Sequence, residues 1–136
     1  MTDHAMRFAD QAERLEGTPF RLHGRDPNTG LDCVGLVACA MHRAGLPCQV
    51  PHGYALRNLD ITTLLGCAAA SGFIETAAPV SRGDLLLVKP GPAQHHLCIA
   101  LGTHRIVHAH AGVGRVVVHG WPDTWPVLRC WRLAQT

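Results

Sequence analysis

Apolar residues recur with the period of a helix near the N-terminus. The residues that follow this spacing are Ala5, Phe8, Ala9, Ala12 and Leu15. Because positions three and four apart lie on one face of a helix, the pattern predicts an amphipathic helix. Gly17, followed by Thr18 and Pro19, predicts where this helix ends.

A second helical pattern begins after an irregular segment. Between Phe20 and Gly30, glycine, proline and asparagine residues indicate a loop. From Asp32 and Cys33 onward, apolar residues return at helical spacing, and a glycine and a proline at positions 45 and 47 end the pattern. The sequence therefore predicts that Cys33 lies at the N-terminus of a helix.

The pattern changes in the C-terminal half of the chain. A third helix, capped by Asp60 and extending to about Ser71, is predicted before the change. After Pro79 the chain consists of short β-rich runs separated by glycine and proline. These runs are Asp84–Val88, His96–Leu101, Arg105–His108, Arg115–His119 and Val127–Leu133. Helices followed by strands predict an α+β fold, with N-terminal helices packed on a C-terminal antiparallel sheet, and we expect one domain over residues 1–136.

Composition and charge argue against several classes of protein. Apolar residues make up 47% and charged residues 16% of the chain, as in a folded globular domain. Lysine and arginine outnumber aspartate and glutamate by 12 to 10 without forming a basic cluster, so we expect no nucleic-acid partner. The apolar stretches are far shorter than the ~20 residues that cross a bilayer, so we expect no membrane span. The N-terminus mixes charged with apolar residues, which predicts no signal peptide and synthesis in the cytoplasm.

One of the six cysteines differs from the others in its predicted position. None belongs to a Cys-x-x-Cys pair, and we expect all of them to be reduced thiols. At a helix start, unpaired N–H groups and the helix dipole stabilise a thiolate, so the pKa of Cys33 is predicted to be lowered. The same N–H groups could bind the oxyanion of a tetrahedral intermediate. Cys33 is thus the candidate nucleophile; the alternative, expected for the other five, is a small buried apolar residue.

A cysteine nucleophile needs a base, and the chain has ten histidines. In the predicted strand His96–Leu101, the large apolar residues at 97, 99 and 101 share one face, and the smaller residues at 98 and 100 share the other face with His96. A face of small residues lets a helix end approach closely. We therefore predict that His96, rather than His95, faces Cys33 and acts as the base.

His108 is the candidate third member of the site. It ends the next predicted strand, and the connection from Gly102 to His104 is consistent with a hairpin that makes the two strands neighbours. A second imidazole can orient the first and fix its tautomer. His110, two residues later, is the alternative for this role. The remaining histidines considered are expected to be surface or satisfied core groups: His4, His23, His42, His52, His104 and His119.

Four blocks of residues stand in a characteristic order along the chain. They are Gly17-Thr18-Pro19-Phe20, Leu31-Asp32-Cys33-Val34-Gly35-Leu36, Arg82-Gly83-Asp84-Leu85, and His96-Leu97-Cys98-Ile99-Ala100-Leu101-Gly102 with His108. In order and spacing the chain resembles the NlpC-type cell-wall cysteine peptidases over roughly residues 8–118, and the four blocks together are far more specific than any one alone. The resemblance implies a papain-like fold of minimal size.

The resemblance also implies roles for these residues. Cys33 would be the nucleophile, His96 the base and His108 the residue that orients His96, while Phe20 and Asp32 are the predicted substrate-binding residues. Members of this family usually cleave next to γ-linked D-glutamate and a diamino acid in peptidoglycan stem peptides. The resemblance therefore implies a cysteine endopeptidase that hydrolyses such an amide bond without a cofactor or a metal.

The chain further resembles the branch of this family encoded with phage tails and gene-transfer particles. That likeness implies tail or particle proteins as partners and action at the cell wall after delivery by a particle. Two positions depart from the family pattern, which often has tyrosine in place of Phe20 and serine in place of Val34. The first departure removes a hydroxyl group near Cys33.

Two other classes of function remain open. A catalytically silent structural subunit of a phage-tail-like particle is the main alternative, although such a subunit would be expected to have lost one of the three catalytic residues. A metal site is the second, since His108 and His110 could form a ligand cluster with His96 or Cys98. No spacing typical of a metalloprotein supports that cluster.

Overall fold

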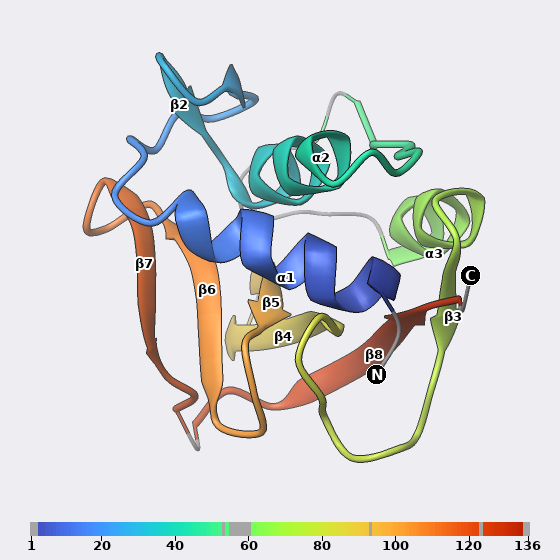
Figure 1. Ribbon diagram of the computed structural model, residues 1–136. Helices are drawn as coiled ribbons and strands as arrows, with labels where there is room; N and C mark the ends of the chain where they lie inside the picture. The colour runs from blue at the N-terminus through green and yellow to red at the C-terminus, as the bar shows by residue number, and fades with distance from the viewer. Residues whose placement is uncertain (1–2, 53, 55–60, 93, 123, 135–136) are drawn as a thin grey trace.

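The computed structural model describes residues 3–52, 54, 61–92, 94–122 and 124–134. Within them the chain forms the helices α1 (Asp3–Arg14), α2 (Cys33–Arg43) and α3 (Ile61–Ala70), followed by most of the strands (Figure 1). The predicted α+β class is confirmed. None of the described helices is both long enough and apolar enough to cross a membrane.

The helices begin and end close to where the sequence predicts. In α1 the buried side chains are Ala5, Phe8, Ala9 and Ala12, so its apolar stripe is the face turned to the core. In α2 the carboxylate of Asp32 caps the first turn, and Gly45 follows the last with φ of +74°, a conformation that glycine adopts without strain. The predicted cap of α3, Asp60, lies outside the described residues.

One antiparallel sheet holds the strands of the C-terminal half, in the order β3-β8-β4-β5-β6-β7. Its strands are β3 (Phe73–Glu75), β4 (Leu85–Gly91), β5 (Gln94–Ala100), β6 (Arg105–His110), β7 (Arg115–Gly120) and β8 (Val127–Leu133). The five predicted strands are all present, and β5 and β6 are adjacent and antiparallel, as the predicted hairpin requires. The edge strand β3 escaped prediction because three residues are too few to show a period.

The segment expected to be a plain loop contains a small ribbon. Strands β1 (Arg25–Asp26) and β2 (Gly30–Leu31) pair antiparallel beside the start of α2. With two residues each, neither strand has a hydrophobic pattern that a sequence could reveal. The ribbon matters because it covers the N-terminus of α2.

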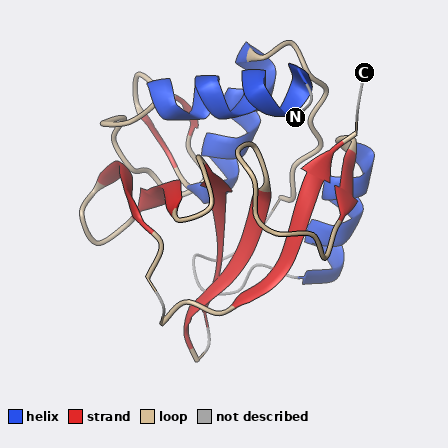
Figure 2. Cartoon of the chain, turned by 60° about the horizontal axis from the view of Figure 1, so that its bottom comes forward, coloured by secondary structure: helices blue, strands red, loops and turns tan. Residues whose placement is uncertain are grey.

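The two faces of the six-stranded sheet are covered differently. Leu97, Ile99 and Leu101 pack in the main core with side chains of α1 and α2, including Cys33. A smaller cluster on the other face contains Cys98, Ala100 and tryptophan side chains that follow β7. The N-terminal helices thus lie over one side of the strands (Figure 2). The expectation that α2 packs on the face of small residues is wrong, because the large residues offer more apolar area to bury.

Candidate active site

A cleft of about 180 Å³ opens where the start of α2 meets the ends of β5 and β6. Its lining comes from six parts of the chain that are far apart in sequence: Phe20, Cys33, Pro90, Gln94–His96, His108–Gly112 and Trp125. All three residues predicted to be catalytic are therefore on one cleft. Phe20, predicted to bind substrate, is on it as well.

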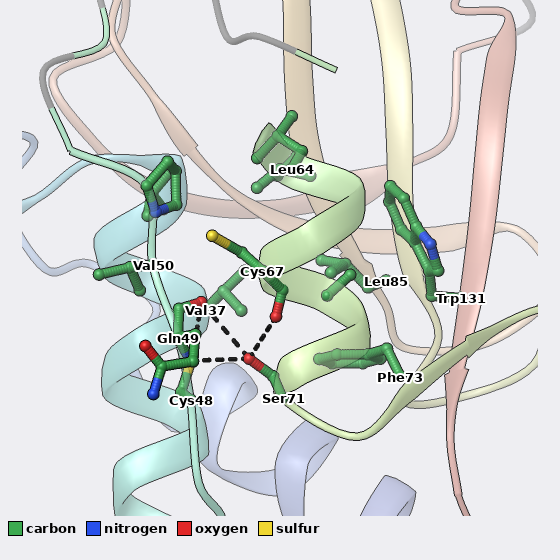
Figure 3. A pocket seen from close by; sticks show the side chains of 14 residues that line it. Val37, Cys48, Gln49, Val50, Leu64, Cys67, Ser71, Phe73, Leu85 and Trp131 are labelled. Atoms are coloured by element: carbon green, nitrogen blue, oxygen red, sulfur yellow. Dashed lines mark hydrogen bonds between the residues drawn. The ribbon is translucent and has the colours of Figure 1, made fainter. Parts of the chain in front are cut away.

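A second hollow, bounded by α2, α3 and the sheet, is a packing cavity. It holds only about 30 Å³ and is lined almost entirely by apolar side chains, including Val37, Leu64, Phe73, Leu85 and Trp131 (Figure 3). At its edge the hydroxyl of Ser71 donates to the carbonyl of Cys67 at 2.7 Å and accepts from the N–H of Gln49 at 2.8 Å (Figure 3). These bonds tie α3 to the segment that follows α2. A space of this size holds about one water molecule, not a peptide.

Cys33 is the first residue of α2, as the sequence predicts. The N–H of Gly35 donates to the Asp32 carboxylate at 2.8 Å, which satisfies one of the free donors of the first turn. Gly35 also permits a close approach, because a Cβ atom there would lie 2.0 Å from the carbonyl oxygen of Gly24. The ribbon can therefore rest directly on the start of the helix and hold Cys33 in place.

Asp32, predicted to bind substrate, is 1% exposed and its carboxylate is occupied by other groups. Besides capping α2, it accepts hydrogen bonds from the backbone N–H of His23, from the Arg25 guanidinium at 3.1 Å, and from the hydroxyl of Tyr54. Arg25 in turn donates to the Tyr54 hydroxyl at 2.9 Å. Asp32 is thus not among the residues that line the cleft, and its carboxylate joins the ribbon to α2. Neither Arg25 nor Tyr54 lies in a motif, so the sequence pattern does not distinguish them from other residues.

Strands β5 and β6 are no longer paired with each other where Cys33 contacts β5. The ladder pairs Ile99 with Val107 and Ala100 with Ile106 and, among the described residues, extends no further toward His96. The backbone N–H of Leu97, left without a strand partner on this side, forms a hydrogen bond with the Cys33 sulfur. This separation explains how His96 lines the same cleft as Cys33, although strand alternation turns its side chain away from α2.

His96 and His108 are in direct contact. Nε2 of His96 lies 2.8 Å from Nδ1 of His108, a hydrogen-bond distance, and the two rings meet edge to face. His110, the alternative partner for His96, instead accepts a hydrogen bond at its own Nδ1 from the N–H of Val113. Of the two candidates, His108 is the one whose ring bonds to His96.

The row of imidazoles extends one residue further than predicted. Nε2 of His108 lies 2.6 Å from Nε2 of His119 on β7, so His119, expected to be a surface or satisfied core histidine, is joined to the predicted site. The indole ring of Trp125 lies 6.2 Å from His96, 5.3 Å from His108 and 5.9 Å from His119, between ring centroids. The sequence alone does not show that His108 and His119 are in contact, because this contact depends on the register between β6 and β7.

Burial changes the protonation of the candidate nucleophile and base. It raises the pKa of Cys33 to about 12, an effect larger than the opposing one of the backbone hydrogen bonds from Leu97 and Val34. The predicted lowering of this pKa is therefore wrong. Burial also lowers the pKa of His96 to about 4. Both shifts favour a neutral thiol and a neutral imidazole before substrate binds.

One group of side chains has the composition of a metal site. The ligand atoms of His96, Cys98 and His108 all lie within 4.8 Å of one another. The two imidazole nitrogens, however, are 2.8 Å apart, which is a proton-sharing distance. Tetrahedral zinc ligands at ~2.0–2.1 Å from the metal keep roughly 3.3 Å between them. The arrangement fits a hydrogen-bonded pair of histidines better than a zinc site.

The sequence matches a known family over most of its length. Residues 17–125 match the model of the NlpC/P60 family. A comparison with curated proteins finds no match. The matched range contains the cleft residues from Phe20 to Trp125.

Solved structures share the fold at low sequence identity. The NlpC/p60 domain of the peptidoglycan hydrolase SagA is 22% identical, with a TM-score of 0.63 and coverage of 95% of this chain and 98% of that one. NlpC1 from Trichomonas vaginalis is 20% identical, with a TM-score of 0.67 and coverage of 94% and 44%. The peptidoglycan hydrolase RipB from Mycobacterium tuberculosis is 22% identical, with a TM-score of 0.64 and coverage of 98% and 66%. The chain thus spans nearly all of the SagA domain but less than half of the Trichomonas protein.

Proposed function

The chain belongs to the NlpC/P60 family, and from that membership we propose that it is a cysteine endopeptidase acting on the peptide part of peptidoglycan. The observation that carries this proposal is the meeting of Cys33, at the start of α2, with His96 on one cleft. A thiol at a helix start beside an imidazole is the arrangement that nucleophilic attack on an amide requires.

The first half of the reaction forms an acyl-enzyme. The Cys33 sulfur attacks the carbonyl carbon of the amide while its proton passes to Nδ1 of His96, the ring nitrogen not bonded to His108. The carbonyl oxygen becomes an oxyanion, which backbone N–H groups and the dipole at the start of α2 can stabilise. As the tetrahedral intermediate collapses, the C–N bond breaks and the same proton leaves with the amine. A thioester on Cys33 remains.

The second half releases the acyl group. A water molecule attacks the thioester carbonyl and gives one proton to His96, and the sulfur leaves as the C–S bond breaks. The proton returns to the sulfur, so enzyme and thiol are restored. His108, bonded to the other nitrogen of the ring, keeps the imidazole in position through both halves.

The lining of the cleft suits an acidic peptide. The cleft presents the imidazoles of His95 and His110, and no described lining residue is an aspartate or a glutamate. Phe20, Pro90 and Trp125 provide apolar walls. Stem peptides carry free carboxylates and short apolar side chains, and by the motif resemblance the bond cut is next to D-glutamate and a diamino acid.

We also propose that the protein reaches the wall after synthesis in the cytoplasm, delivered by a phage-tail-like or gene-transfer particle. This part of the proposal rests on the motif resemblance. None of the three solved structures compared above is described as a tail or particle protein. Co-purification of the protein with intact particles, and its absence from particle-free lysate fractions, would test delivery separately from chemistry.

Digestion of purified peptidoglycan, with mass analysis of the fragments, tests the activity itself. Each stem-peptide bond leaves fragments of a distinct mass, and Cys33→Ala should release none. Cys39→Ala is the matched control, because Cys39 lies on the same helix outside the cleft lining and should keep wild-type activity. Folded wild-type protein that releases no fragments would favour the structural-subunit alternative. Elemental analysis of the same preparation tests the metal alternative.

A further inference from the structure

Three histidines on adjacent strands form a continuous hydrogen-bonded row that ends at a backbone carbonyl. Nε2 of His96 on β5 contacts Nδ1 of His108 on β6 at 2.8 Å, and Nε2 of His108 contacts Nε2 of His119 on β7 at 2.6 Å. Nδ1 of His119 then lies 2.7 Å from the carbonyl oxygen of Gly120. Every ring nitrogen in the row has a partner within the row except Nδ1 of His96.

The sheet brings His119 to this position. In the ladder between β6 and β7, His119 pairs with Ile106 and His108 pairs with Val117. Residues two apart on a strand share a face, so His108 and His119 are diagonal neighbours on the same face of the sheet. That face is the one opposite α1 and α2, and Trp125 packs against both rings.

The carbonyl at the end of the row determines where the first proton lies. A carbonyl oxygen only accepts hydrogen bonds, so Nδ1 of His119 must carry the proton it donates to Gly120. In a neutral imidazole the other nitrogen is then an acceptor. Nε2 of His119 therefore accepts from His108, and the proton of that bond belongs to Nε2 of His108.

The same reasoning continues along the row. Since Nε2 of neutral His108 carries its proton, Nδ1 of His108 accepts, and Nε2 of His96 must donate to it. His108 is 1% exposed. This burial is the largest of the causes that lower the pKa of its imidazole to about 2. Nδ1 of His96 is then left with a free lone pair, as a general base requires.

We propose that His119 is a positioning residue that sets the tautomers of His108 and His96, so that the nitrogen of His96 with the free lone pair is Nδ1. The kinetic part of this proposal rests on the proposed peptidase function. His119 is outside the residues that line the cleft, so it acts through His108 rather than on the substrate. Without an acceptor at position 119, Nε2 of His108 has no partner for its proton within the row, and the opposite tautomer would place a proton on Nδ1, the nitrogen that faces His96.

Direct measurement of the tautomers tests the proposal without any substrate. In protein labelled with ¹⁵N-histidine, long-range ¹H–¹⁵N correlation spectra distinguish the Nδ1–H from the Nε2–H form of each ring. We expect Nε2–H for His96 and His108 and Nδ1–H for His119 in the wild type. His119→Gln keeps an acceptor at the place of Nε2 and should retain the Nε2–H form of His96. His119→Leu removes the acceptor and should convert His96 partly to the Nδ1–H form.

Kinetics of the same variants show whether the tautomer matters for turnover. With an active substrate, His119→Leu should lower kcat about 10- to 100-fold with little change in KM, similar to the loss when a residue that orients a metal-ligating histidine is replaced. His119→Gln should restore most of that loss. His104→Leu, the same substitution at an exposed histidine in the turn after β5, is the control and should behave as wild type.

Three results would overturn the proposal. One is His119→Leu with unchanged tautomers of His96 and His108. The second is His119→Gln as impaired as His119→Leu, because this would mean that the ring only fills space beneath Trp125. The third is wild-type protein in which His96 is protonated at Nδ1. If the tautomers are as expected but wild-type protein cleaves no peptidoglycan, the peptidase function fails while the assignment of His119 stands.

Discussion

Mild acid should destabilise this protein through the imidazoles of its cleft. His108 is buried and His96 is half-buried, and the loss of solvent around them lowers their pKa from the ordinary 6.5 to about 2 and about 4, respectively. In the unfolded chain both would take up protons below pH 6.5, whereas the folded protein excludes them. A group whose pKa is lowered by folding adds stability above its unfolded pKa, and that stability is lost as the pH falls toward the folded pKa.

The size of the effect follows from these values. Between pH 7.5 and 5.5 the unfolded state takes up protons at each histidine while the folded state does not, and each histidine thereby lowers the free energy of unfolding by between about 1 and 2 kcal/mol. For His96 and His108 together the free energy of unfolding should fall by about 3 kcal/mol, which is on the order of a hundredfold in the unfolding equilibrium. This pH interval lies above the main titration of carboxylates.

Urea unfolding at the two pH values measures the loss. His108→Gln keeps a hydrogen-bonding side chain but no imidazole, so its loss between pH 7.5 and 5.5 should be about half that of the wild type. Any packing penalty of the substitution is present at both pH values and cancels in the difference. His104→Gln, at an exposed position in the turn after β5, is the control and should show the full loss. Equal stability of the wild type at both pH values would refute the reasoning, as would a full loss in His108→Gln.

Three further predictions concern the site. On a stem peptide, His96→Ala should be slowest, by on the order of 10² to 10⁴ in rate, His108→Ala intermediate and His95→Ala near wild type; an inactive His95→Ala would reassign the base. Because the pKa of Cys33 is raised and that of His96 lowered, kcat/KM should stay nearly constant from pH 6 to 9, and an acidic limb centred between pH 6 and 7 would contradict the neutral pair. Gly35→Ala should destabilise the protein and slow turnover, since its Cβ would lie 2.0 Å from a backbone carbonyl; thermal melting equal to that of the wild type would argue against this close contact.

The features that the sequence predicts well depend on neighbours along the chain. The periodic apolar residues of α1 and the cap at Asp32 act within a few positions, so the helix starts and the place of Cys33 could be read directly. The five longer strands have enough residues to show a β pattern, and their order after the helices indicates the fold class.

The contacts that complete the site depend on residues far apart in sequence. From strand alternation we predicted that His96 faces α2, but the helices pack on the opposite face, which carries the large side chains. Cys33 and His96 nevertheless line one cleft, where β5 and β6 separate. The contact of His119 with His108 needs the register of β6 and β7, which no local pattern specifies. The pKa of Cys33 was predicted from the helix dipole, a local property, whereas burial by the whole fold determines its direction. Periodicity and capping are properties of short segments, but strand register, burial and contacts between distant side chains exist only in the folded chain.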